Sequence, residues 1–233
     1  RFQSELGYIS LNTPLRDDEV LAVAFEYTLQ GQVYKVGEMS EDYQSLSQDQ
    51  MIILKMLRPS TVRTKLPTWR LMMKNIYSLN ASQISRDGFQ LRVVYRDDSS
   101  GIDNPSLRQG RMVKDVPLVQ VLNADKVNPV GELQRDGVFD FIERMTIDPQ
   151  FGRVIFPVTE PFGRFLRSRF DDPQERILAD FYAFDALYDS TKADALLAAS
   201  KAKFFLVGLV QSSNSNEIRL PGVQIARGSV RVL

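Results

Sequence analysis

The chain lacks both cysteine and histidine throughout its 233 residues. These two absences exclude disulfide bonds, a serine–histidine catalytic triad, a cysteine nucleophile and a zinc site built from His or Cys ligands. The charges also cancel, because 29 Lys and Arg residues are balanced by 29 Asp and Glu residues. Nucleic acids and anionic membrane surfaces are bound through an excess of basic side chains, so this balance argues against both as partners.

Long hydrophobic runs are missing as well. The longest apolar run spans residues 204–210, whereas a membrane-spanning helix needs about 20 apolar residues. The start at Arg1 has neither the basic nor the apolar region of a signal peptide. The other end alternates like a β-strand at 228–233. A chain that stops inside a strand pattern leads us to expect a piece excised from a longer protein.

Alternation of apolar and polar residues predicts several β-strands. Residues 20–29 place one set of apolar side chains on a single face, and Gly31 then permits a turn, so residues 20–38 are expected to form a β-hairpin with a buried apolar face that includes Phe25. The clearest alternation spans 89–95. Further strands are expected at 8–12, 68–79, 153–161, 204–211 and 217–233. The run 51–57 is compatible with a helix or a strand.

Helix signals are concentrated in the second half of the chain. Asp172, Pro173 and Glu175 predict an N-cap, a first helical residue and a capping box for a helix over 171–188. One apolar face of that helix would carry Ile177, Phe181, Phe184 and Tyr188. Thr191 and Asp194 predict the start of a second helix that ends near Ala202, and a short helix is expected after Pro117, at 116–122.

These elements do not alternate regularly between strand and helix, which disfavours a doubly wound parallel sheet. The sequence therefore predicts a mainly β chain: an antiparallel β-sandwich, jelly-roll-like, with two to four inserted α-helices. Residues 1–233 are expected to form one β-rich domain. A subdivision into a hairpin-rich part, 1–115, and a mixed strand and helix part, 116–233, is the alternative.

Acidic residues between 123 and 160 offer two candidate sites. A glycosidase needs two carboxylates facing a sugar cleft, and the candidates for such a pair are Glu132, Asp136, Asp140, Glu143 and Glu160. A calcium loop could use Asn123, Asp125, Asn128, Asp136 and Gly137, with Asp140 or Glu143 as a late ligand. Lys126 and Pro129 interrupt that pattern, which favours a polar turn that hydrogen-bonds to itself. We therefore expect no catalytic residue, no metal and no cofactor.

Two further clusters have ordinary structural interpretations. The basic residues Arg164, Arg167, Arg169 and Arg176 could meet an acidic partner, but Asp171, Asp172 and Glu175 lie close by in sequence and favour internal pairing. Aromatic residues on expected strands could form a platform that binds sugars, as in a carbohydrate-binding module, although core positions are commoner for them. They are Tyr27, Tyr34, Tyr77 and Tyr95. Pro161 and Gly163 are expected to form a structural corner at 158–163.

Several segments, in order along nearly the whole chain, resemble the SprA/Sov family. They are LGYISLNTPLRDDEVLAVAFEYT at 6–28, GQVYKVGE at 31–38, DGVFDF at 136–141, GRVIFPVTEPFG at 152–163, FDALYDST at 184–191 and GSVRV at 228–232. One departure is visible, because the resemblance leads us to expect a small residue such as Gly near Arg144, before the segment MTI at 145–147.

The resemblance implies a piece of the very large outer-membrane translocon of type IX secretion in Bacteroidota, which is also linked to gliding motility. It implies a giant β-barrel through which folded proteins reach the cell surface. The implied partners are the rest of that barrel, the plug and shuttle components of the secretion system and the secreted cargo, with no nucleic acid and no small-molecule substrate. The family contributes no catalytic residue. The alternative is a carbohydrate-binding β-sandwich module of a secreted or surface protein.

Overall fold

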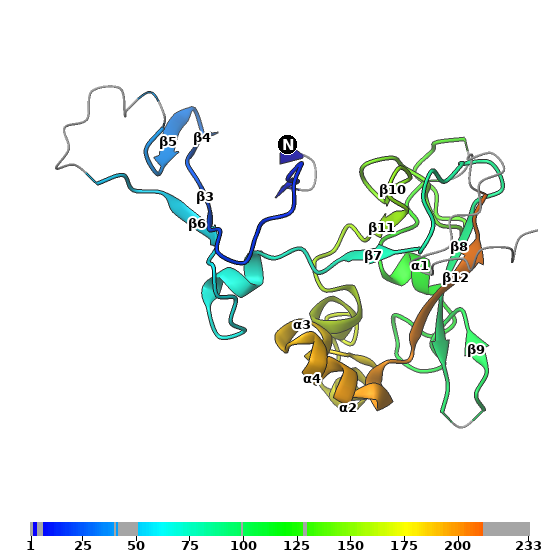
Figure 1. Cartoon of the computed structure of the whole chain (residues 1–233). Coiled ribbons are helices and arrows are strands. Elements are labelled where there is room, and N and C mark those ends of the chain that lie inside the picture. Colours follow the sequence, from blue (N-terminus) through cyan, green and yellow to red (C-terminus); the bar gives the residue numbers. More distant parts are fainter. Residues whose placement is uncertain are drawn as a thin grey trace, which may run out of the picture.

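The computed structural model describes residues 2–3, 7–39, 41, 51–98, 100–127 and 130–211 (Figure 1). Its strands are β1 (Phe2–Gln3), β2 (Tyr8–Ile9), β3 (Leu21–Val23), β4 (Phe25–Leu29), β5 (Gln32–Val36), β6 (Lys55–Arg58), β7 (Ile76–Ser78), β8 (Gln90–Arg96), β9 (Asp103–Asn104), β10 (Ile147–Asp148), β11 (Arg153–Ile155) and β12 (Phe204–Leu209). Its α-helices are α1 (Leu118–Val121), α2 (Arg176–Tyr182), α3 (Ala186–Asp189) and α4 (Lys192–Leu197).

All the strand pairs of the described residues are antiparallel and belong to small sheets. Two sheets have three strands, in the orders β12-β8-β9 and β10-β11-β7. The pairs β1-β2, β3-β6 and β4-β5 form sheets of two strands each. In the first three-stranded sheet Leu206 pairs with Val93, and in the second Val154 pairs with Tyr77.

One hydrophobic core joins these two sheets to the helices. Every buried residue in the described part of the chain lies between Asn75 and Lys203. The core takes side chains from β8, α1, β10 and β11 and from the segments that follow, among them Val93, Leu118, Leu122, Ile147, Val154, Phe156, Leu166 and Tyr188. Figure 1 shows α2, α3 and α4 together on one side of this body, with α1 beside β8 and β12.

Strands β3 to β6 form an arm that projects away from the body (Figure 1). The expected hairpin is present, since β4 pairs with β5 and Tyr27 lies opposite Tyr34. The prediction that its apolar face is buried is wrong, because Phe25 is 43% exposed and Leu29 is 55% exposed. Alternation predicts a face of a strand but not whether another layer covers that face. The run at 51–57, ambiguous in sequence, ends in strand β6, which pairs with β3.

The expected helix over 171–188 is interrupted. A 3₁₀ helix, Pro173–Glu175, starts at Asp172, whose side chain accepts a hydrogen bond from the N–H of Gln174 as an N-cap should. Glu175 does not complete the capping box, because its Oε1 accepts from the backbone N–H of Arg111 at 2.6 Å. The chain leaves the helix after α2, where the Phe184 N–H donates to the carbonyl of Phe162 at 2.7 Å.

Because of this interruption, the four residues of the predicted apolar face do not share one buried surface. Phe184 and Tyr188 are buried, whereas Ile177 is 79% exposed and Phe181 is 48% exposed. The second helix starts as expected, with Asp194 N–H donating to Thr191 Oγ1 at 3.2 Å, and a 3₁₀ helix, Ala199–Lys201, follows α4.

The remaining predictions are mostly confirmed. Strand β8, strand β12 and helix α1 lie where the pattern placed them. The strands expected at 8–12 and 153–161 form only in their first residues, as β2 and β11, and a short π-helix, Pro161–Phe165, follows β11. The strand expected at 68–79 is wrong in its first half, which forms a 3₁₀ helix, Pro67–Leu71, before β7. The strands expected at 217–233 lie outside the described residues. The chain is thus mainly β and antiparallel with few helices. The finer jelly-roll-like sandwich and the domain boundaries stay predictions.

Arg144 occupies the position at which the family resemblance suggested glycine, and it has a φ of +67°. Its N–H donates to the Ile147 carbonyl at 2.8 Å, which holds the turn in this left-handed conformation. A left-handed conformation costs a non-glycine residue about 1–2 kcal/mol.

We expect Arg144→Gly to raise the free energy of unfolding by about 0.5–1 kcal/mol, because the relief of strain exceeds the extra entropy of glycine in the unfolded chain. Urea denaturation measures the change. Arg144→Ala removes the same side chain and keeps the strain, so it should give no gain. An equal gain in both variants would assign the effect to the side chain instead.

Candidate functional site

The acidic loop after α1 uses its two buried carboxylates to hold backbone groups. Asp125 is fully buried and accepts from the N–H of Gly137 at 2.7 Å and of Asp136 at 3.3 Å. Asp140 is 7% exposed and accepts from the N–H of Lys126 at 2.6 Å. Burial raises the pKa of Asp140, and the hydrogen bonds from the backbone partly oppose that shift. This arrangement is the self-bonded polar turn that the sequence favoured.

Of the other candidate carboxylates, Asp136 lies near this pair, since its charge helps to raise the pKa of Asp140. Glu160 lies 3.3 Å from the guanidinium of Arg164, and Glu132, Asp136 and Glu143 are exposed. Asn128, a candidate calcium ligand, lies outside the described residues. Among the residues that the structure describes, no three His, Cys, Asp or Glu side chains are grouped so as to hold a metal ion.

Two arginines of the basic cluster, Arg164 and Arg167, are paired internally, but with other acids than the ones expected from the sequence. Arg167 forms ion pairs with Asp180 and, at 2.5 Å, with Asp185. Arg164 lies 2.8 Å from Asp189, and the guanidinium of Arg169 lies over the ring of Phe165 at 4.3 Å. The acidic neighbours proposed from the sequence are paired too, but with a distant arginine: Arg111 reaches Asp171 at 2.8 Å, and its backbone binds Glu175.

The four tyrosines considered as a sugar platform fall into two places. Tyr95 is buried against Tyr182, with 5.2 Å between ring centroids, and Tyr77 donates or accepts a 2.8 Å hydrogen bond with the hydroxyl of Tyr188. Tyr27 and Tyr34 stack on each other in the arm at 5.2 Å. The structure therefore does not bring all four together.

The hairpin face is the surface of the arm formed by Phe25, Tyr27, Leu29, Tyr34 and Val36, which the strand register places on one side. Tyr27 is 44% exposed and Tyr34 is 40% exposed. The charged pair Glu26 and Lys35 lies on the opposite side. A two-stranded hairpin alone is marginally stable in water, so an uncovered face of this kind marks a contact surface.

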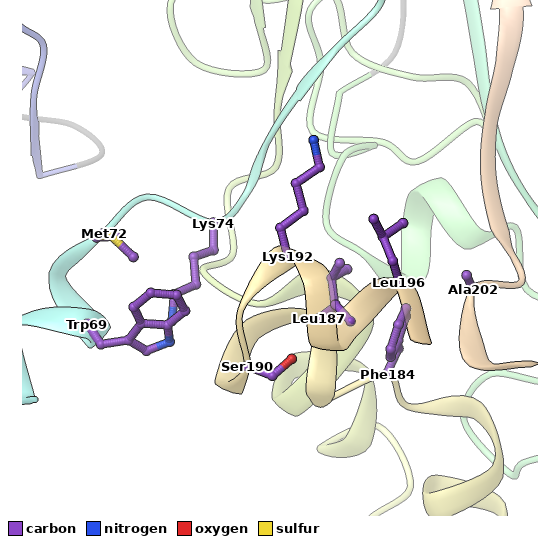
Figure 2. A pocket seen from close by; sticks show the side chains of 10 residues that line it. Trp69, Met72, Lys74, Phe184, Leu187, Ser190, Lys192, Leu196 and Ala202 are labelled. Carbon is purple, nitrogen blue, oxygen red and sulfur yellow. The ribbon is translucent and has the colours of Figure 1, made fainter. Parts of the chain in front are cut away.

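An apolar groove of about 480 Å³ lies where the segment around the 3₁₀ helix Pro67–Leu71 meets α3 and α4. Figure 2 shows Trp69 at one end and Phe184, Leu187 and Leu196 at the other. The remaining residues of the groove are Met72, Lys74, Ser190, Lys192, Ala195 and Ala202. Its volume falls within the range of small-molecule sites, about 300–1,000 Å³.

The end of α3 connects the two sides of this groove. The carbonyl oxygen of Tyr188 accepts from Trp69 Nε1 at 2.7 Å and from Lys74 Nζ at 2.8 Å. The Tyr188 hydroxyl accepts from the N–H of Phe162 at 3.1 Å, and a Cβ on Gly163 would lie 2.6 Å from the Tyr188 ring. In place of the corner expected at 158–163, the π-helix Pro161–Phe165 seats Tyr188, and Gly163 is required for that close approach.

This arrangement perturbs Lys74, and burial also raises the pKa of the Tyr188 hydroxyl. The Lys74 ammonium group lies 4.9 Å from the centroid of the Trp69 ring. Partial burial lowers the pKa of Lys74, while the nearby carboxylates of Glu160 and Asp189 act in the opposite direction.

Sequence reasoning did not find this groove. Its side chains come from segments separated by more than a hundred residues, and no motif connects them. The available signals were the single tryptophan of the chain and the leucine pair Leu196–Leu197 within an Ala-rich helix.

In comparisons with known proteins, neither a family model nor a curated protein matches the chain. Among the residues that the structure describes, no helix is both long and apolar enough to span a lipid bilayer.

Proposed function

We propose that this chain is a non-catalytic structural and interaction domain of an SprA/Sov-type outer-membrane translocon that supports type IX protein secretion and gliding motility. Its partners would be the rest of the translocon barrel, the plug and shuttle components and the secreted cargo. The basis of the assignment is the set of sequence segments that resemble the family. The proposal includes a location at the outer membrane.

The observation that carries the interaction role is the uncovered hairpin face. Large apolar side chains cover one side of a projecting arm. Burying them against another surface would be favourable by roughly 25 cal/mol per Å² of apolar surface removed from water. Phe25, Tyr27 and Leu29 are each more than 40% exposed. A neighbouring protein surface without charge would cover them, since the charged pair Glu26 and Lys35 lies on the other side.

The body behind the arm supports the scaffold part of the proposal. Its buried carboxylates hold backbone groups, and Arg164 and Arg167 are paired with acids of the same body, so these side chains maintain shape. We also propose that the two three-stranded sheets belong to the jelly-roll-like sandwich expected from the sequence. Val93 of one sheet and Val154 of the other are members of the same core cluster, which supports this architecture.

Site-specific photo-crosslinking in the intact protein, expressed in its native cells, tests the interaction role. A photoreactive residue replaces Tyr27 on the hairpin face in one variant and Thr28 on the opposite side in the control. We expect the Tyr27 position to crosslink to another part of the translocon, an identified secretion component or secreted cargo. Equal products from both positions, or products that contain none of these, contradict the proposal.

A carbohydrate-binding module is the second candidate, favoured by three exposed aromatic rings on one sheet face, those of Phe25, Tyr27 and Tyr34. Against it, the rings of Tyr27 and Tyr34 stack at an interplanar angle of 16°, so each covers one face of the other. Electrophoresis in polysaccharide gels separates the two functions. Retardation that is lost in Tyr27→Ala would favour the sugar-binding module over the translocon domain.

A further inference from the structure

We propose that residues 72–74 form a hinge between the arm and the body, and that the hydrogen bond from Trp69 to the Tyr188 carbonyl is a latch that holds the arm in one position. The arm precedes the body in sequence, and the backbone passes from one to the other through this segment (Figure 1). The inference does not rest on the proposed function, because it concerns how the arm is held and not what the arm binds.

The backbone of residues 72–74 has the properties of a hinge. The segment leaves the 3₁₀ helix Pro67–Leu71 in an extended conformation, with Met72 at a φ of −72° and a ψ of 136°. Within the part of the chain that the structure describes, the backbone N–H groups of Met73 and Lys74 donate no hydrogen bond. A segment without backbone hydrogen bonds can change its dihedral angles at little cost, as the hinges of moving domains do.

The body is fixed from the next residue onward. Asn75 is 7% exposed, and its side-chain amide donates to the Phe156 carbonyl at 2.5 Å. The Asn75 carbonyl in turn accepts from the Phe156 N–H at 2.9 Å, and strand β7 then pairs with β11. A movement of the arm is therefore confined to the bonds that precede Asn75.

The latch spans the hinge, because Trp69 lies on its arm side and Tyr188 on its body side. The short helix α3 ends next to Tyr188 and leaves the carbonyl of this residue without a partner inside the helix. Trp69 Nε1 donates to that carbonyl at 2.7 Å. The acceptor cannot follow the arm, since the Tyr188 ring is buried and its hydroxyl accepts from the Phe162 N–H at 3.1 Å. Release of the indole therefore frees the arm while α3 stays in place.

The other contacts across this junction, among the residues that the structure describes, constrain the arm only weakly. The groove of about 480 Å³ keeps the apolar surfaces on its two sides from packing fully, and Leu196 on the body side is 68% exposed. The bond from Gln3 Nε2 to the Arg144 carbonyl is exposed and long, at 3.4 Å. Lys74 also donates to the Tyr188 carbonyl, but it belongs to the hinge itself. The indole bond is thus the short, directional contact that sets the position of the arm.

Spin labels test the latch directly, because the chain has no cysteine and two introduced cysteines carry the only labels. Double electron–electron resonance measures the distances between Thr28→Cys on the arm and Arg92→Cys on the body, both at exposed strand positions. With Trp69 present we expect one narrow distribution. Trp69→Phe keeps a ring and loses the donor, so the ratio of released to latched chains should rise about threefold to tenfold, the effect of one hydrogen bond. Trp69→Ala, which also loses the ring, should raise that ratio further.

Two controls separate the latch from a general loss of structure. Arg70→Ala removes an exposed side chain from the same 3₁₀ helix and should leave the distance distribution unchanged. A second label pair within the body, at Arg92 and at Leu197 of α4, should keep its distance in every variant.

Three results would overturn the proposal. A broad arm-to-body distribution in the chain that retains Trp69 would mean that this bond does not hold the arm. An unchanged distribution in both Trp69 variants, or an equal change in Arg70→Ala, would assign the position of the arm to other contacts. Equal broadening of the label pair within the body would mean that Trp69 supports the fold as a whole and not the position of the arm.

Discussion

Gly152→Ala lowers the free energy of unfolding by about 3–5 kcal/mol. Gly152 ends the turn between β10 and β11 at a φ of +60°, and a Cβ there would lie 1.6 Å from the carbonyl oxygen of Ala81. The neighbour is backbone, and the adjacent chain is anchored by the Leu79 N–H, which donates to the Gly152 carbonyl at 2.8 Å. Neither segment can move aside without breaking the sheet that contains β7. Urea denaturation measures the loss.

The matched control is Gly101→Ala. Gly101 has nearly the same φ, +65°, but no atom lies within 4 Å of its added Cβ. Its cost is therefore limited to the left-handed conformation, about 1–2 kcal/mol. Similar losses at both positions would mean that the approach of residue 81 to residue 152 is not a fixed feature of the fold.

Asp125→Ala has the second largest expected effect, a loss of about 2–4 kcal/mol of unfolding free energy. The carboxylate is fully buried, and its removal leaves the N–H groups of Asp136 and Gly137 without an acceptor. Asp125→Asn should lose less, since its amide oxygen can still accept from the N–H of Gly137. Thermal and urea denaturation of the native chain, Asp125→Asn and Asp125→Ala should show stability falling in that order.

Asp136→Ala is the control for this loop. Asp136 is exposed and accepts only a local hydrogen bond from the Val138 N–H, at 2.9 Å, so we expect a loss of about 1 kcal/mol or less. Millimolar calcium should leave the midpoint of the native chain unchanged, because backbone donors already occupy the oxygens of Asp125. A calcium-dependent rise that disappears in Asp125→Asn would instead restore the ion-binding interpretation.

The acidic loop also shows how far sequence reasoning reached in the candidate sites. The interruptions at Lys126 and Pro129 argued against a calcium loop, and the short spacing of opposite charges argued for paired arginines. Both arguments depend on neighbours in sequence. The structure agrees with the first, since Asp125 holds backbone groups of its own loop. It agrees with the second only in that Arg164 and Arg167 are paired, because their partners are Asp189, Asp180 and Asp185 and not the acids expected from the spacing. The groove could not be predicted from the sequence, because Trp69 and Lys74 meet the Tyr188 carbonyl only after folding.

Local chemistry in the sequence determined the antiparallel, mainly β character of the chain, the alternation of β8, the start of α4 at Thr191 and the hairpin turn at Gly31. These features follow from the alternation of side chains along a strand and from hydrogen bonds between residues close in sequence. Both depend only on the local sequence.

Tertiary structure alone decided which faces are covered and where the long helix breaks. The face of β4 looks like a core face in sequence, but the strand projects in an arm, and Phe25 stays exposed. The predicted helix over 171–188 ends early because the backbone of Phe184 bonds to Phe162, a partner that no local pattern reveals. Burial and long-range hydrogen bonds depend on what the rest of the chain places alongside, and this is the physical reason that they could not be read from the sequence.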